Sequence, residues 1–202
     1  ADDGGSLSTE IKTIDQASDS FIYDPKDPVP SIGSQYQTFD FCGPRDRSHI
    51  QLRPDVLTFT TDVLTEDLEI TGPISATVWA SSDAIDTDFT ATLTDLEPEG
   101  KAIALCEGIV RARFRDGTEN PQMIIPGKIY KFEIDMWNTS NSFNKGHRIR
   151  IEISSSNFPR YNRNLNSGNP IASDTDITIA NQTVYHGSKY PSHINLPLIP
   201  AS

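Results

Sequence analysis

The residues that could act as nucleophiles and bases do not form a hydrolytic site in this sequence. An α/β-hydrolase serine needs a Gly-x-Ser-x-Gly turn between a strand and a helix, and none of the 12 glycines has that spacing. The four histidines contain no pair at the i, i+2 or i, i+4 spacing that would place two metal ligands on one face. We therefore expect no catalytic residue, no metal and no cofactor in this chain. The histidines are His49, His147, His186 and His193.

Three aspartates, Asp83, Asp86 and Asp88, crowd one short segment and could together hold a calcium ion, which prefers carboxylate oxygens. The segment lacks the central glycine and the distal glutamate of an EF-hand loop. Aspartates also cap turns while remaining solvated. We favour the turn-capping interpretation and leave calcium binding open.

Three arginines alternate along a predicted strand over residues 109–115 and would share one face of it. On that face Arg111, Arg113 and Arg115 could clamp a carboxylate or a phosphate. They could equally pair with acidic residues on neighbouring strands, because the chain has 28 Asp and Glu against 17 Lys and Arg. This acidic excess favours the second interpretation. The expected partners are Glu133, Asp135 and Glu152.

Two tryptophans, Trp79 and Trp137, are in phase with the polar positions of their predicted strands. An outward tryptophan stacks on a sugar, lies under a loop or contacts another domain. No second exposed aromatic residue is predicted beside either one, which argues against sugar stacking. The two cysteines, Cys42 and Cys106, lie in no C-x-x-C pair. We expect two buried thiols, although one disulfide bond would also fit.

The elements that must position these residues are β-strands, because hydrophobic residues repeat with a period of two. Residues 128–137 place Tyr130, Phe132, Ile134 and Met136 on one side and mainly charged residues on the other. The same alternation runs through residues 74–80, 89–93, 109–115, 147–154 and 194–198. Shorter apolar segments lie at residues 56–61, 68–70, 102–106 and 183–185. About nine or ten antiparallel strands are therefore expected, each with one dry and one wet face.

These strands predict an all-β fold, a jelly-roll β-sandwich of two mainly antiparallel sheets. Residues 1–34 contain three prolines between positions 25 and 30, and we expect them to run extended over the surface as an N-terminal strap of the domain. The sandwich itself is expected over residues 35–202. Within it, residues 155–182 form a long, polar, weakly patterned loop, and loops of this length usually serve a function.

The overall composition excludes several partners. A net charge of -11 argues against binding to nucleic acid or to an anionic membrane surface. No apolar run approaches the roughly 18–20 residues of a membrane-spanning helix. The chain opens with Ala-Asp-Asp-Gly-Gly, without the apolar region of a signal peptide. This start favours a domain cut from a longer protein and a cytoplasmic location over secretion.

Long segments of the chain are similar to one family of serine hydrolases. The matching stretches are Tyr-Asp-Pro-Lys-Asp-Pro-Val-Pro at residues 23–30, Gly-Pro-Arg-Asp-Arg at 43–47, Arg-Pro-Asp-Val-Leu at 53–57, Asp-Thr-Asp-Phe-Thr-Ala at 86–91, the segments 102–111, 146–149 and 154–164, and Pro-Ser-His-Ile at 191–194. They resemble the C-terminal β-sandwich domain that is shared by X-Pro dipeptidyl-peptidases, cocaine esterases and α-amino-acid ester hydrolases. The resemblance covers essentially the whole chain.

The resemblance implies a galactose-binding-domain-like jelly roll, in agreement with the strand pattern. It also places the Ser-Asp-His triad in a separate N-terminal α/β-hydrolase domain of the same polypeptide. In that family the sandwich packs on the catalytic domain and helps to wall its acyl pocket, and a Leu-Phe pair in one loop contributes to the wall. This chain lacks the Leu-Phe pair. Here the corresponding loop offers Tyr36, Phe39 and Phe41 as pocket-wall candidates. Candidate interdomain contacts are Trp79, Trp137, Arg160 and Tyr161, and a homodimer of the parent protein is compatible with the resemblance.

Two function classes follow. The leading hypothesis is a non-catalytic domain of a serine hydrolase that acts on esters or on amide bonds at a peptide N-terminus, so that this chain alone is inactive. The alternative is a stand-alone carbohydrate-binding jelly-roll module. It rests on the two outward tryptophans and on the polar loop at residues 155–182.

Overall fold

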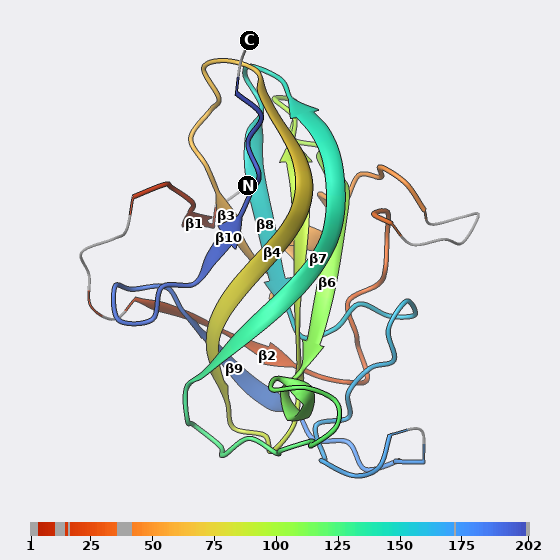
Figure 1. Ribbon diagram of the computed structural model, residues 1–202. Coiled ribbons are helices and arrows are strands. Elements are labelled where there is room, and N and C mark those ends of the chain that lie inside the picture. Colours follow the sequence, from red (N-terminus) through yellow and green to blue (C-terminus); the bar gives the residue numbers. More distant parts are fainter. Residues whose placement is uncertain (1–3, 11–14, 16, 36–41, 172, 201–202) are drawn as a thin grey trace.

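Figure 1 shows the computed structural model of the chain, which describes residues 4–10, 15, 17–35, 42–171 and 173–200. The described residues form ten β-strands and two single-turn 3-10 helices, and no α-helix. None of their helices is long and apolar enough to cross a membrane. The strands are β1 (Gly5–Ser6), β2 (Ser18–Tyr23), β3 (Leu57–Thr60), β4 (Leu68–Ser82), β5 (Asp88–Leu96), β6 (Ala102–Arg111), β7 (Tyr130–Phe143), β8 (Arg148–Ser154), β9 (Ala180–Tyr185) and β10 (His193–Asn195). The 3-10 turns are η1 (Ile50–Leu52) and η2 (Ala112–Phe114).

The strands form two sheets that pack face to face as a β-sandwich (Figure 1). The first sheet has the order β1-β3-β8-β5-β6, and the second has the order β10-β4-β9-β2. Strands β10 and β9 pair with successive parts of one edge of β4, and the long strand β7 pairs with its opposite edge. The curved strands β4 and β7 lie side by side in Figure 1. Every pairing is antiparallel except that of β1 with β3. The predicted sandwich of two mainly antiparallel sheets is confirmed.

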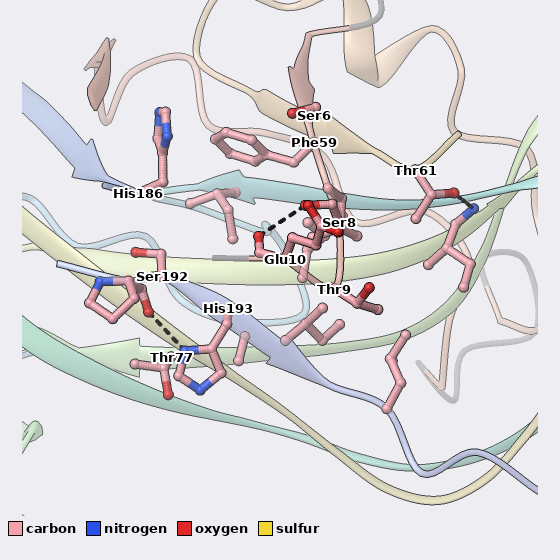
Figure 2. A pocket seen from close by; sticks show the side chains of 18 of the residues that line it. Ser6, Ser8, Thr9, Glu10, Phe59, Thr61, Thr77, His186, Ser192 and His193 are labelled. Carbon is pink, nitrogen blue, oxygen red and sulfur yellow. Dashed lines mark hydrogen bonds between the residues drawn. The ribbon is translucent and has the colours of Figure 1, made fainter. Parts of the chain in front are cut away.

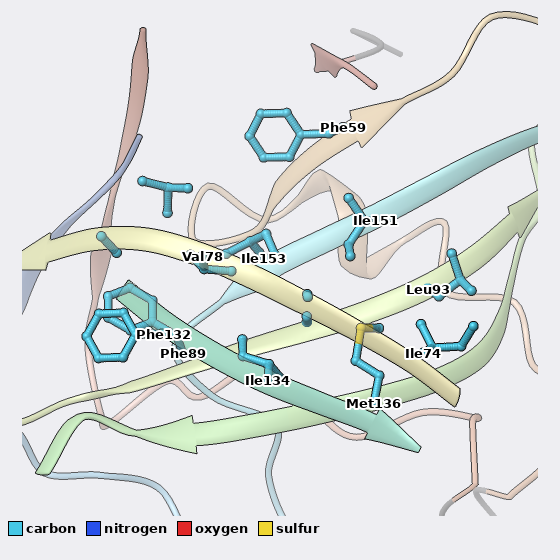
Figure 3. Packing of buried hydrophobic residues seen from close by; sticks show 14 of the residues in the cluster. Phe59, Ile74, Val78, Phe89, Leu93, Phe132, Ile134, Met136, Ile151 and Ile153 are labelled. Carbon is cyan, nitrogen blue, oxygen red and sulfur yellow. The ribbon is translucent and has the colours of Figure 1, made fainter. Parts of the chain in front are cut away.

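The core lies between the sheets and is built by the predicted alternation. In β7, Phe132, Ile134 and Met136 are buried, and the charged residues between them are exposed. Phe89 of β5 meets Phe132 across the sandwich with ring centroids 4.8 Å apart (Figure 3). Full burial of one such side chain stabilises the fold by roughly 1.5–3 kcal/mol. The alternating pattern therefore fixes which face of each strand points into the core.

The two sheets come closest at one edge of the sandwich, where β6 approaches β7. A Cβ atom at Gly108 would lie 2.1 Å from the carbonyl oxygen of Asp135 and 2.8 Å from the side chain of Ile134. Real Cβ atoms are not found so close to backbone atoms, so only glycine fits here. Gly108 thus sets the separation of the sheets at this edge.

A β-bulge in β7 orients Trp137. Pro73 of β4 is opposite Asn138, but Ser75 is opposite Asp135, so two residues of β7 face one residue of β4. Trp137 has a positive φ of 68°, its N–H donates to Oδ1 of Asp135, and its side chain is 61% exposed. The bulge adds a residue and turns this side chain outward. Trp137 therefore lies on the outer face of its strand, as predicted.

Two predictions about the strands need correction. The strand expected over residues 109–115 ends at Arg111, and Ala112–Phe114 form η2 instead. The turn forms because the N–H of Ala112 donates to Thr87 and that of Arg113 donates to the Asp86 side chain, which pulls the chain away from the sheet. In addition, β2 lies within the region expected to be an extended strap, and it forms an edge of the second sheet by pairing with β9.

The outer face of the first sheet is covered by the chain itself. The segment after β2 runs beside the loop that follows β8, where Ser31 N–H donates to Phe158 O (2.7 Å) and Phe158 N–H donates to Val29 O (2.8 Å). Val29, Ile50 and Val56 form a second, small apolar cluster in this cover. Both faces of β5 and β8 are consequently buried, so the face that was expected to be wet is an internal polar layer.

Candidate functional site: an internal polar layer and an apolar cavity

A buried ion pair anchors the cover to the first sheet. Arg47, in the segment before η1, pairs with Glu152 of β8 at 2.8 Å, and both side chains are at most 3% exposed. Arg47 also donates to the carbonyl of Ile32 (2.9 Å), and Gln51 donates to Glu152 (2.9 Å). Burial alone would lower the pKa of Arg47, but the carboxylate of Glu152 outweighs it and holds the pKa above its ordinary value. The ion pair and its hydrogen bonds therefore connect the strap at Ile32, the turn η1 and the first sheet.

A second buried carboxylate, Glu107 of β6, lies beneath the base of the loop that was predicted to wall an acyl pocket. Arg160 Nη1 lies 2.8 Å from its Oε1. Gln35 brackets the Glu107 backbone, because its Nε2 donates to Glu107 O (2.7 Å) and its Oε1 accepts from Glu107 N–H (3.1 Å). Burial raises the pKa of Glu107 despite Arg160 and Arg47. These contacts fix the chain at Gln35, directly before residues 36–41.

The predicted pocket-wall residues Tyr36, Phe39 and Phe41 lie outside the described residues. The two ends of their loop are described and meet in an antiparallel bridge, in which Gly43 N–H donates to Ser34 O (2.9 Å). The loop thus has a closed base, which is held by Gln35 on Glu107.

A third polar group joins β5, the end of β6 and the long loop after β8. Arg111 binds Asp88 through two hydrogen bonds of 2.8 and 2.9 Å, and Arg113 Nε binds Asp86 at 2.8 Å. Asn164 Nδ2 donates to both carboxylates, at 2.8 and 2.9 Å. Each charge is therefore compensated by a directed partner, as burial demands.

This arrangement corrects two predictions. Asp86 and Asp88 are not solvated turn caps, because they are fully buried and form ion pairs with Arg113 and Arg111. Asp83 is exposed and caps no local turn in these contacts, because its carboxylate accepts the backbone N–H of Asn181 in β9 at 2.8 Å. Among the described residues no cluster of three or more His, Cys, Asp or Glu side chains could hold a metal ion. The expected arginine partners Glu133, Asp135 and Glu152 are also wrong, since the arginines pair with Asp88, Asp86 and Asp116.

The remaining candidate contacts lie at separate places on the surface. Trp79 is partly buried by the loop after β9, where its ring packs against Tyr190 with centroids 5.4 Å apart. Trp137 is exposed on β7. Arg160 stacks on Tyr161, with its guanidinium carbon 5.1 Å from the ring centroid, beside the 43% exposed Phe158. The structure therefore brings Arg160 and Tyr161 together.

Two of the histidines, His147 and His186, are held in contacts with aspartates. His147 contacts Asp95 (2.9 Å), His186 contacts Asp19 (2.7 Å), and neither contact involves a nucleophile. Both cysteines are free: Cys106 is buried as predicted, whereas Cys42 is exposed, contrary to prediction. Burial and the neighbouring Glu107 raise the pKa of Cys106 to about 12, which keeps the thiol protonated.

Sequence reasoning missed an apolar cavity of about 740 Å³ between the two sheets. Its walls include Phe59 of β3, Ile151 of β8, Val78 of β4 and Ile194 of β10. Figure 2 shows Phe59 and His193 on opposite sides of the cavity, with Ser8 and Glu10 between them in this view. The apolar part of its lining includes strand positions that the alternation assigns to the core, such as Val78, Ile151 and Ile194, so the alternation does not separate these cavity positions from ordinary core packing.

The fold and these contacts define an all-β sandwich whose buried charged groups pair with one another. Comparison with known proteins agrees. The sequence profile of the X-Pro dipeptidyl-peptidase C-terminal non-catalytic domain matches residues 2–195. The cocaine esterase of Rhodococcus sp. (strain MB1 Bresler) is 49% identical over 200 residues, which cover 97% of this chain and 34% of that protein.

Two solved structures share the fold at high similarity. An aminopeptidase from a marine sediment archaeon, Thaumarchaeota archaeon, superposes with a TM-score of 0.89 at 29% identity, over 97% of this chain and 35% of that one. An α-amino acid ester hydrolase gives 0.87 at 30% identity, with the same coverage of the two chains. The chain belongs to the family of X-Pro dipeptidyl-peptidase C-terminal non-catalytic domains, and it spans about one third of the length of these relatives. In these relatives the domain is a non-catalytic C-terminal part of a much longer polypeptide.

Proposed function

We propose that this domain packs on an N-terminal α/β-hydrolase domain of the same polypeptide and forms part of the wall of its acyl pocket. In the parent enzyme a serine would attack the carbonyl of an ester, or of an amide at a peptide N-terminus, with histidine as the base and aspartate orienting it. This chain would supply no reacting group. Its contribution would be pocket shape and a fixed contact between domains.

The observation that carries this proposal is the closed base of the loop over residues 36–41. Ser34 and Gly43 bridge the base, and Gln35 is held on the backbone of Glu107 by two hydrogen bonds. A loop anchored in this way can present aromatic side chains in a fixed position, as a substrate pocket requires. Tyr36, Phe39 and Phe41 are the residues that we propose for the pocket wall, and the anchored base of their loop supports this proposal.

The interdomain face would lie beside that loop. Phe158, Arg160 and Tyr161 combine an exposed ring, a guanidinium and a second ring on one short segment, which is the composition found at well-packed interfaces. Arg160 also forms an ion pair with Glu107, the same residue whose backbone holds Gln35 at the base of the loop. Trp79 and Trp137 remain further contact candidates, and a homodimer of the parent remains a prediction of the family resemblance.

The alternative, a carbohydrate-binding module, loses one of its two platforms. Trp79 packs against Tyr190 under a loop, which leaves Trp137 as the exposed tryptophan. A single ring without a neighbouring aromatic is a weak sugar platform. Affinity electrophoresis on a panel of polysaccharides separates the hypotheses, and we expect no retardation.

Kinetics of the full-length parent test the proposed function. Phe39→Ala or Tyr36→Ala should change the ratio of kcat/KM values across p-nitrophenyl esters of increasing acyl length by several-fold, with little change in stability, because a hydrophobic contact contributes roughly 1–3 kcal/mol of discrimination. Thr118→Ala, in an exposed loop, is the matched control. The isolated 202-residue chain should hydrolyse none of these esters. Unchanged acyl preference in both aromatic variants, or turnover by the isolated chain, would refute the proposal.

A further inference from the structure

A second, polar cavity lies at the end of the sandwich where β6 runs into η2. It has a volume of about 200 Å³ and lies between the end of β6 and the long loop after β8. That loop reaches this end of the sandwich (Figure 1), where Arg113 Nη2 donates to the carbonyl of Asn169 at 3.2 Å. Because a cavity of roughly 150 Å³ holds a benzene molecule, this one can accept a small group of similar size.

Two arginines in the lining are held from behind by buried carboxylates. The side chain of Arg111 is 12% exposed and pairs with Asp88, which is 1% exposed. The side chain of Arg113 is 10% exposed and pairs with the fully buried Asp86. Asn164, which also lines the cavity, links the two carboxylates through its Nδ2 group. Neither guanidinium group can turn away without leaving a buried charge unpaired, so both are fixed in the cavity wall before any ligand binds.

The three arginines that line the cavity keep N–H donors that the protein does not use. Arg111 and Arg113 bind their partners through Nε and Nη2, and within the described residues their Nη1 groups form no hydrogen bond. Arg163 donates through Nη1 to the carbonyl of Pro25 at 2.9 Å, and its other donors have no partner in the described part of the chain. Because a guanidinium group stays protonated at neutral pH, three cationic groups with spare donors line one cavity.

The charges around this cavity nearly balance. The two buried aspartates compensate the arginines that they bind, which leaves Arg163 as a cation without an ion-pair partner among the described residues. Asp174 also lines the cavity, and its carboxylate accepts hydrogen bonds from Ser167 and Asn169. An anion in this cavity is therefore held mainly by directed N–H donors, and Arg163 and Asp174 act on its charge in opposite directions.

We propose that this cavity is a binding site for a phosphate group, either free or on a phosphomonoester. The Nη1 groups of Arg111 and Arg113 each donate to one oxygen of the anion, and Arg163 donates to a third oxygen from the rim. Donors on three different residues match the three terminal oxygens of a phosphate group better than the two oxygens of a planar carboxylate. The site uses neither the loop over residues 36–41 nor a catalytic domain, so it is independent of the proposed acyl-pocket wall.

Isothermal titration calorimetry at constant ionic strength tests this site, with inorganic phosphate and glycerol phosphate as the probes. We expect saturable binding with a Kd of roughly a millimolar or tighter. Arg163→Gln should weaken binding several-fold, because it removes a donor and a positive charge beside the anion. Asp174→Asn should strengthen binding several-fold, because it removes a negative charge and keeps the shape of the side chain. Lys131→Gln, on the exposed face of β7, is the matched control and should leave the Kd unchanged.

The opposite signs of the two loop substitutions distinguish a bound anion from a structural role of the loop, because a loosened loop would weaken binding in both variants. Absence of saturable binding for both probes would overturn the proposal. Equal weakening by Lys131→Gln and Arg163→Gln would also overturn it, because only the overall charge of the chain would then matter. Acetate that binds as tightly as phosphate would refute the assignment to the phosphate class.

The comparison of the two probes identifies the form of the ligand. A lower Kd for glycerol phosphate supports a phosphomonoester, and a lower Kd for inorganic phosphate supports the free ion. Circular dichroism checks that each variant is folded. If the 202-residue chain does not fold by itself, the same titrations of the full-length parent decide by the same criteria.

Discussion

The internal polar layer and the apolar cavity lie on opposite sides of the first sheet and are closed in different ways. On the outer side the chain covers Glu152 and Glu107 with its own strap and loops and pairs each with an arginine. On the inner side a large apolar cavity is left between the sheets. A buried charge without a partner costs several kcal/mol of stability, whereas apolar surface without a partner costs less. The domain therefore uses its own segments to cover the side of the first sheet on which an unpartnered group would cost more free energy.

The largest expected effect comes from the polar layer. Arg47→Ala leaves Glu152 buried without its ion-pair partner and should lower the free energy of unfolding by about 3–5 kcal/mol. Urea unfolding followed by circular dichroism measures it. Lys131→Ala is the control, since Lys131 and Glu133 pair on the exposed face of β7 and should contribute about 0–1 kcal/mol. Similar values for the two variants would mean that the layer does not hold the cover in place.

The next largest effect is the difference in stability loss between a substitution in the filled core and one at the rim of the cavity. Leu93→Ala, at a fully buried position of β5, should cost about 2–5 kcal/mol. Leu196→Ala, at the rim of the cavity, should cost less than about 1.5 kcal/mol in the 202-residue chain, because part of its side chain is already exposed. Urea midpoints of both variants make the comparison. Equal losses would contradict the distinction between core and rim.

The smallest effect depends on pH. Burial alone would raise the pKa of Asp46, but hydrogen bonds from Ser48 and from the backbone of Ala102 outweigh it and hold the pKa below its ordinary value. Its stabilising contribution is therefore present above the unfolded-state pKa of about 3.9 and is lost as pH falls through the lower folded-state value. Asp46→Asn should cost about 1 kcal/mol at neutral pH. The difference from the wild-type chain should shrink toward about pH 3 in urea titrations, and a constant difference would contradict this assignment.

Most of the strands after residue 34 could be predicted because one of their faces is mainly apolar. Ile149, Ile151 and Ile153 are in the core as their spacing requires, and Phe132, Ile134 and Met136 behave alike. The opposite faces could not be predicted. Thr90, Thr92 and Thr94 look like a wet face, yet all three are buried, because the residues that cover them come from distant segments such as Gln51. Periodicity reports which face is apolar, and it cannot report whether the polar face is covered.

The candidate site was predictable to a lesser degree. The arginine alternation at 111–115 looks like a continuous strand face, but Asp86 binds both the backbone and the side chain of Arg113 and replaces the strand by a turn. Arg160 and Tyr161 could be named only through the resemblance, since Arg160 is held by Glu107 of a distant strand and Tyr161 by its contact with Arg160. The cavity depends on the spacing of two sheets, which no single segment encodes.

Gly108 has a mechanical consequence for the whole sandwich. At that edge, backbone meets backbone between β6 and β7 without a side chain that could yield. The opposite edge, between β1 and β10, is bordered by the cavity. The separation of the sheets is therefore fixed by backbone at one edge, whereas at the other edge it is bordered by side chains that can adjust their positions. A side chain introduced at Gly108 would force the sheets apart at the edge that has no room to adjust.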